Sequence, residues 1–125
     1  MKKAKWIIIP VEIKAREFAS RLLLAIGAIN RGYGVIIGPN IVRRYLPILP
    51  KGIFFDKSIS NNKYNILKKI KKQGYVITSI DEEGLASIHN PFEYLKQRLS
   101  QSTIELSANI FTWGQSEAKV IKENY

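Results

Sequence analysis

Acidic side chains follow two apolar stretches that are typical of β-strands. Glu12 and Glu17 come after residues 6–11, and the wholly acidic segment 81–83 comes after residues 75–80. In a parallel sheet the carboxyl ends of all strands lie on one edge, and in open α/β folds that edge is where ligands bind. The sequence therefore predicts a polar site at this edge.

The segment after the first apolar stretch carries two carboxylates and two cations. Lys14 and Arg16 stand between Glu12 and Glu17. A guanidinium beside a helix N-terminus suits an anionic ligand, because its fork can hold phosphate or carboxylate in two hydrogen bonds while backbone N–H groups assist. The same four charges can instead pair with one another, with Glu17 favourably placed near the positive end of the helix dipole. Both interpretations stay open.

Three further carboxylates stand together before Gly84. Asp81, Glu82 and Glu83 follow the fourth predicted strand, which we expect to lie beside the first strand, as in the usual doubly wound order. Like charges this close raise one another's pKa, so one of them could serve as a general acid or base. The alternative is that all three are solvated or cap the segment that follows.

Other chemically useful residues are predicted at the ends of the third and fifth strands. Lys57 and Ser58 follow the third strand and Trp113 ends the fifth, which places a cation, a hydroxyl and an indole on the same edge. An indole beside polar groups is a platform for sugar rings in some sites and an ordinary core residue in others. His89 is the single histidine and is assigned a structural or exposed role. Cysteine is absent, and no metal site is expected.

Strand-like and helical segments alternate along the chain. Apolar residues recur at helical spacing from Ala15 to Ile29, and Gly32 falls at the position of a helix C-cap. Asn90 and the proline after it begin a helix whose apolar stripe runs to Leu106. The predicted strands are 6–11, 33–37, 53–55, 75–80 and 108–113, and the predicted helices are 15–29, 41–46, 60–73, 90–106 and 115–122.

This alternation predicts the fold class. Strands that alternate with helices across short loops form a parallel sheet with right-handed crossovers, and near-continuous apolar strands are buried on both sides. We therefore expect an α/β fold: a Rossmann-like, doubly wound parallel sheet of about five strands with helices on both faces. At 125 residues the chain has the length of one domain, which we assign to residues 1–125.

Several classes of protein are excluded by absent motifs. The turn after the first strand lacks the glycines of the dinucleotide-binding G-x-G-x-x-G motif, and no P-loop pattern occurs. The longest apolar run, residues 22–29, is far shorter than the roughly 20 residues of a membrane span. Lysines precede the first strand, but no small-residue cleavage site follows it, so we expect a cytoplasmic location.

The net charge of +10 is unevenly placed. Residues 1–80 contain 16 basic and 3 acidic residues, whereas residues 81–125 contain 4 and 7. A basic region favours attraction to nucleic acid, an anionic membrane surface or phosphorylated substrates, although a run such as 68–72 is also typical of a solvated helix face. An alternative function is therefore a non-enzymatic basic domain that binds nucleic acid or an anionic membrane surface. Its candidate residues are Lys51, Lys57, Lys63, Lys68, Lys69, Lys71 and Lys72.

Seven short segments together resemble the first half of bacterial surface carbohydrate biosynthesis proteins. They occur in the order of that family and cover nearly the whole chain. The segments are Ile9 to Glu12 with Arg16 and Glu17, Leu22 to Ala25, Arg31 to Tyr33, Leu49 to Ile53, Asp56 to Ser58, Asp81 to Gly84, and Phe111 to Gly114.

The resemblance carries expectations about function. That family is similar to GT-B-type glycosyltransferases, in which two Rossmann-like halves face each other across a cleft. It implies that this chain is the N-terminal, acceptor-side half of such a protein in surface polysaccharide biosynthesis. The partners would be a sugar acceptor and a nucleotide-sugar donor, the donor being held by a second domain or partner chain without which the chain has little activity. No cofactor is implied, nucleic acid is not an expected partner, and the cytoplasmic domain would lie near the inner-membrane surface.

The same resemblance assigns roles to eight residues. Matched by motif, it implies catalytic roles for Glu12 and Glu83 in proton transfer. It implies substrate-binding roles for Arg16, Glu17, Lys57, Ser58, Glu82 and Trp113.

Overall fold

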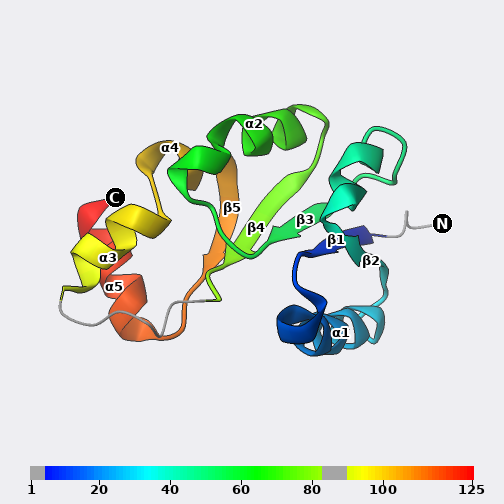
Figure 1. Cartoon of the computed structure of the whole chain (residues 1–125), viewed down its shortest axis with the longest axis horizontal. Coiled ribbons are helices and arrows are strands. Elements are labelled where there is room, and N and C mark those ends of the chain that lie inside the picture. The colour runs from blue at the N-terminus through cyan, green and yellow to red at the C-terminus, as the bar shows by residue number, and fades with distance from the viewer. Residues whose placement is uncertain (1–4, 83–89) are drawn as a thin grey trace.

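The computed structural model describes residues 5–82 and 90–125, and in this part of the chain five strands form one sheet (Figure 1). Every neighbouring pair of strands is parallel, in the order β2-β1-β3-β4-β5. The expected parallel α/β fold is therefore confirmed. The strands are β1 (Lys5–Val11), β2 (Tyr33–Pro39), β3 (Ile53–Asp56), β4 (Val76–Ile80) and β5 (Ser107–Phe111). The helices are α1 (Lys14–Ile29), η1 (Asn40–Tyr45), η2 (Asn61–Lys63), α2 (Tyr64–Lys72), α3 (Pro91–Arg98), α4 (Gln101–Leu106) and α5 (Gln115–Asn124).

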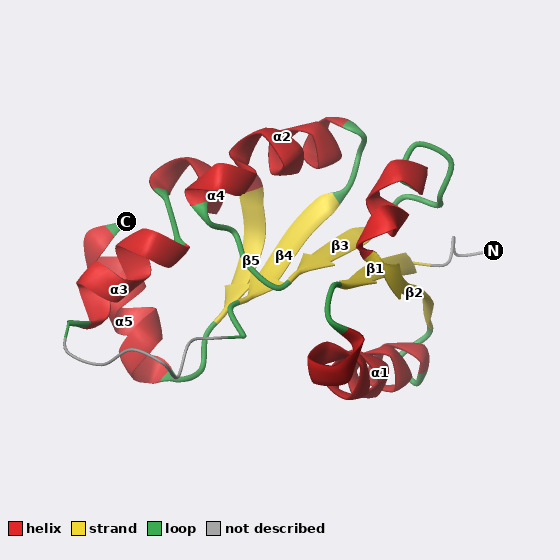
Figure 2. Cartoon of the chain, viewed as in Figure 1, coloured by secondary structure: helices red, strands yellow, loops and turns green. Residues whose placement is uncertain are grey.

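Helices cover both faces of the sheet (Figure 1 and Figure 2). On one face α1 packs its Ala25 against Ile9 and Phe55. On the other face η1, α2 and α4 close a larger core that includes Ile8 and Phe54. Since successive side chains of a strand point to opposite faces, the neighbours Ile8 and Ile9 enter different cores. This explains why the strands read as continuous apolar runs.

The strand order corrects one expectation. The fourth strand was expected beside the first, but β3 lies between β1 and β4. After β2 the chain crosses back over β1 and adds β3 on its other side, so the order reverses between β1 and β3. In open α/β sheets the crevice at such a reversal is the usual ligand site. The loops that follow β1 and β3 are therefore the ones that flank the expected ligand site.

The predicted helix 90–106 is wrong as a single helix. It divides into α3 and α4, because Leu99 and Ser100 have extended backbone conformations. The Ser100 side chain accepts a hydrogen bond from the backbone N–H of Thr103, and the Thr103 hydroxyl lies 3.3 Å from the Ser100 nitrogen, which completes a capping box. The expected cap at Asn90 is confirmed, since its side chain accepts from two backbone N–H groups of α3.

Two glycines end helices as the sequence indicates. Gly32 and Gly74 have φ angles of 84° and 92°, which side chains with a Cβ rarely adopt. A third glycine is required by close packing: a Cβ on Gly52 would lie 2.1 Å from the carbonyl oxygen of Trp6 in β1. Among the described residues, no helix combines the length and the apolar character needed to cross a bilayer.

Candidate functional site

Lys57 lies between two carboxylates at the point where the sheet order reverses. Its ammonium nitrogen is 2.9 Å from Oε1 of Glu17 and forms an ion pair with Glu12. Lys57 follows β3, Glu12 follows β1, and Glu17 belongs to the first turn of α1. One cation thus joins the loop after β3 to the start of α1, which is 40 positions earlier in the sequence. The sequence prediction that Glu12, Glu17 and Lys57 share one edge agrees with this arrangement.

Glu17 is buried and its carboxylate is fully occupied. Only 1% of the residue surface is exposed, and Oε2 accepts hydrogen bonds from the backbone N–H groups of Glu12 (2.6 Å) and Ile13 (3.0 Å). The Ile13 side chain cannot cap α1, so the start of the helix needs another acceptor. Glu17 supplies that acceptor and, through its other oxygen, holds Lys57 in place.

The pKa values of these three groups follow from their contacts. The hydrogen bond from Lys57 lowers the pKa of Glu12 below its ordinary 4.5 and outweighs the effect of burial. Burial raises the pKa of Glu17, but the bonds from Lys57, Ile13 and Glu12 outweigh it, so that pKa is also lowered from 4.5. Burial lowers the pKa of Lys57, but its bonds to the two glutamates raise it above 10.5 overall. All three groups are charged at neutral pH.

A second ionic cluster is centred on Asp56, the residue before Lys57, and consists of one carboxylate near two cations. Asp56 is buried, and its carboxylate lies 2.8 Å from the Lys63 ammonium and 3.4 Å from a nitrogen of the Arg43 guanidinium. The Lys57 backbone N–H also donates to Asp56 over 2.7 Å. Asp56 therefore ties η1 and η2 to the end of β3. Sequence reasoning missed this role, although Asp56 is the sole acidic residue between positions 18 and 80.

The two described carboxylates after β4, those of Asp81 and Glu82, pair with different cations. Glu82 lies 2.7 Å from the buried Arg21 guanidinium of α1, in a geometry that makes an ion pair without a well-directed hydrogen bond. Asp81 accepts two hydrogen bonds from Arg98, at 2.6 and 2.8 Å. Arg21 also stacks on the Phe55 ring at 5.0 Å. The two described carboxylates thus each face a cation, and the β4 loop reaches across to α1.

The remaining predicted site residues are spread along the same edge. Ser58 is half-buried beside Lys57, and Arg16 is exposed in the first turn of α1. Trp113 is 46% exposed, so it is not a core residue, and its indole N–H donates to the carbonyl oxygen of Asp81. Glu83 and His89 lie outside the described residues. Glu12 contacts Lys57, which also pairs with Glu17 of α1, and Glu82 contacts Arg21 of α1. The loops after β1, β3 and β4 therefore meet near the start of α1.

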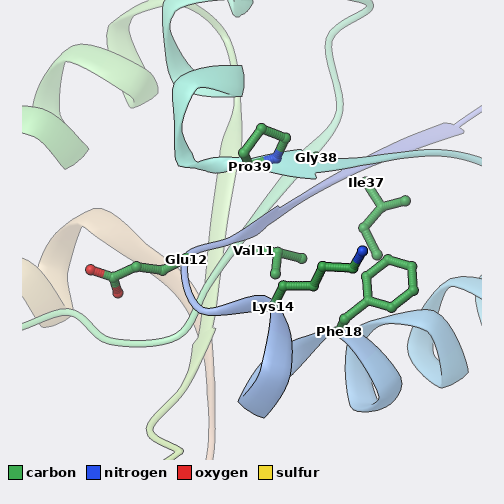
Figure 3. A pocket seen from close by; sticks show the side chains of 7 residues that line it. All are labelled: Val11, Glu12, Lys14, Phe18, Ile37, Gly38 and Pro39. Carbon is green, nitrogen blue, oxygen red and sulfur yellow. The ribbon is translucent and has the colours of Figure 1, made fainter.

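A hollow of about 280 Å³ opens beside this edge, between β1, β2 and α1 (Figure 3). Its wall is mainly apolar, and the Lys14 ammonium lies 5.9 Å from the centre of the Phe18 ring. Figure 3 shows the Glu12 carboxylate pointing away from Lys14 and Phe18. This carboxylate forms the ion pair with Lys57. Glu12 therefore belongs both to the lining of the hollow and to the ionic cluster. The lining residues are Val11, Glu12, Lys14, Phe18, Ile37, Gly38 and Pro39.

One residue of this edge, Arg21, is missing from the sequence predictions. Arg21 occurs among apolar residues of α1, where its 4% exposure and its pair with Glu82 are not apparent. One signal was available for Arg21, because a cation four residues after Glu17 lies on the same helix face. Among the described residues, no three His, Cys, Asp or Glu side chains lie together as potential metal ligands.

Comparison with known proteins gives no identification. Neither the protein-family models, nor the curated proteins, nor the solved structures include a match to this chain.

Proposed function

We propose that this chain is the acceptor-binding domain of a glycosyltransferase-like protein that builds bacterial surface polysaccharide. The proposal rests on the resemblance of its motifs and on one observation: Glu12, a half-exposed carboxylate, is held ionised by Lys57 at the reversal of strand order. An ionised carboxylate accepts hydrogen bonds from the hydroxyl groups of a sugar. The donor would be bound by a second domain or a partner chain.

In this proposal Glu12 orients the acceptor more than it moves protons. A general base works best when its pKa is near the working pH, and the bond from Lys57 lowers the pKa of Glu12 instead. Trp113, with its exposed ring, would supply a flat surface for the sugar further along the edge. Glu17 would act through Lys57, because its own carboxylate is buried.

Saccharide binding to the whole chain tests this proposal. Saturation-transfer NMR with a panel of neutral and acidic monosaccharides should detect contacts in the wild type and lose them in Glu12→Gln. Glu123→Gln is the matched control, since the Glu123 side chain is 60% exposed on α5 and is not one of the proposed site residues. A panel in which no sugar binds, or in which Glu12→Gln binds as the wild type does, would overturn the proposal.

The basic-domain alternative is favoured by a different observation. Lys57 and Lys63 form internal ion pairs. Lys68, Lys69 and Lys72 are instead exposed on α2, a helix that has no acidic residue. Binding of nucleic acid through such cations would weaken steeply as salt is raised. Fluorescence anisotropy with a short RNA and a short DNA duplex at low ionic strength tests this alternative, and an absence of binding there would remove it.

A further inference from the structure

A second cavity of about 280 Å³ lies between η1 and α2, on the sheet face opposite α1. We call it the cationic cavity. It shares no lining residue with the hollow beside Glu12. Its lining residues are Arg43, Arg44, Pro47, Ile66, Lys69, Ile70 and Gln73.

Three cations line this cavity and no acid does. Arg43 is partly compensated, since one of its guanidinium nitrogens lies 3.4 Å from Asp56. Arg44 and Lys69 are both exposed, and neither side chain makes a hydrogen bond or an ion pair with any residue that the structure describes. Residues 18–80 hold eleven basic residues and one acidic residue, Asp56, so Asp56 is the sole carboxylate along this stretch that can offset the charge. The cavity therefore has a positive potential that attracts anions.

Unpaired polar atoms belong to the same cavity residues. Within the described chain, four buried side-chain nitrogen or oxygen atoms lack a hydrogen-bond partner, and two of them are Nε of Arg43 and Oε1 of Gln73. A buried polar atom without a partner costs free energy, and a group that forms a hydrogen bond with it removes that cost. A ligand that brings oxygen atoms and water into the cavity would offer Arg43 an acceptor. The Gln73 amide can present its oxygen or its NH₂ group to the same ligand.

The shape and the floor of the cavity indicate the size of that ligand. Pro47, Ile66 and Ile70 form an apolar part of the lining, and the volume is near the lower end of small-molecule pockets, which begin at about 300 Å³. Two neighbouring cations make contacts elsewhere and do not line the cavity. Lys71 reaches toward the main chain of α4, and Lys68 lies over the Tyr64 ring at 5.4 Å.

We propose that the cationic cavity binds the phosphate groups of a small, water-soluble ligand. Guanidinium groups recognise phosphate by pairs of parallel hydrogen bonds, and an ammonium adds a point charge that tolerates several orientations. Arg43 is preset for this task because Asp56 and the Phe54 ring, 5.9 Å from its guanidinium carbon, hold it in place. Arg44 of η1 and Lys69 of α2 then contact the anion from two further sides.

Titration of the whole chain with inorganic pyrophosphate at low ionic strength tests this proposal. Amide signals of η1 and α2 should shift in NMR spectra, and the affinity measured by calorimetry should fall by about tenfold for each cation removed, in Arg44→Gln and in Arg44→Gln/Lys69→Gln. Both side chains are exposed, so the variants should keep the wild-type circular dichroism spectrum. Lys119→Gln/Lys122→Gln removes the same charge from exposed positions of α5 and should bind as the wild type does.

Three outcomes would overturn the proposal. They are an equal loss of affinity in the α5 control, wild-type affinity in Arg44→Gln/Lys69→Gln, and binding of a short single-stranded DNA by a chain that pyrophosphate does not bind. Glu12→Gln should leave pyrophosphate binding unchanged, so this test and the saccharide test fail independently.

Discussion

The Lys57 ammonium lies 2.9 Å from Oε1 of Glu17, across 40 positions of sequence, and this ion pair fixes the loop after β3 to the first turn of α1. The other carboxylate oxygen of Glu17 accepts hydrogen bonds from backbone N–H groups of the turn before α1. The pair is therefore part of the helix start as well as of the candidate site. Its removal should disturb both.

Lys57→Gln should destabilise the fold. The change leaves Glu17 buried with its backbone donors but without its cation, and loss of a charged hydrogen bond costs about 1–3 kcal/mol. Urea denaturation at pH 7 measures the change. Lys119→Gln is the control, because Lys119 and Glu123 are exposed and 3.8 Å apart, and such surface pairs contribute little. If Lys57→Gln unfolds at the same urea concentration as the control, Lys57 does not hold this edge together.

The stability that Lys57 confers should depend on pH in a defined direction. The pKa values of Glu12 and Glu17 are lowered by folding from 4.5, so their contribution is present above pH 4.5 and is lost as the pH falls through the folded pKa values. The pKa of Lys57 is raised by folding, so its contribution is present below pH 10.5 and is lost as the pH rises through the raised value.

A pH series of denaturation curves checks this dependence. The difference in unfolding free energy between wild type and Lys57→Gln should be largest between about pH 5 and pH 10, and it should shrink as the solution is acidified toward pH 3. Comparing the two proteins cancels the titration of the other carboxylates. A difference that stays constant down to pH 3 would contradict the ionic origin of the effect.

Much of the fold could be predicted because its signals are local. Apolar runs, helix periodicity, glycine ends and the Asn90 cap each depend on neighbours in sequence, and the structure has those elements. The order of strands is not local. The apolar pattern is the same whether β3 or β4 lies beside β1. The sequence prediction therefore followed the commoner order, with β4 beside β1. In the structure β3 occupies that place.

The candidate site shows the same division. That Glu12, Glu17 and Lys57 share one edge follows from parallel strands alone, whereas the burial of Arg21 and Asp56 and their ion-pair partners appear only in the structure. The break between α3 and α4 could have been found, because Ser100 followed by Thr103 is a local capping signal. The prediction of one continuous helix followed instead from the apolar stripe that continues through Leu99.

Gly52→Ala should weaken the pairing of β1 with β3. A Cβ at position 52 would lie 2.1 Å from the Trp6 carbonyl oxygen, and a backbone atom in a paired strand cannot move away without loss of register. Overpacking of this kind typically costs about 1–3 kcal/mol. Gly114→Ala is the matched control, since its Cβ would meet no atom within 4 Å and its φ of 172° is ordinary extended backbone. Equal melting temperatures for the two variants would mean that β1 and β3 are not held this closely.

Two apolar positions of α1 should respond in opposite ways to a change of side-chain size, because the helix buries Ala25 and Ala28 and exposes large apolar residues such as Leu23. Ala25 is 3% exposed against the sheet, whereas Leu23 is 72% exposed. Ala25→Leu should therefore destabilise the fold by about 1–3 kcal/mol through overpacking. Leu23→Ala should change the stability by less than about 0.5 kcal/mol, because few contacts are lost at an exposed position. Helix periodicity alone would favour the reverse result, with Leu23 in the core, so urea denaturation of the two variants decides which side of α1 faces the sheet.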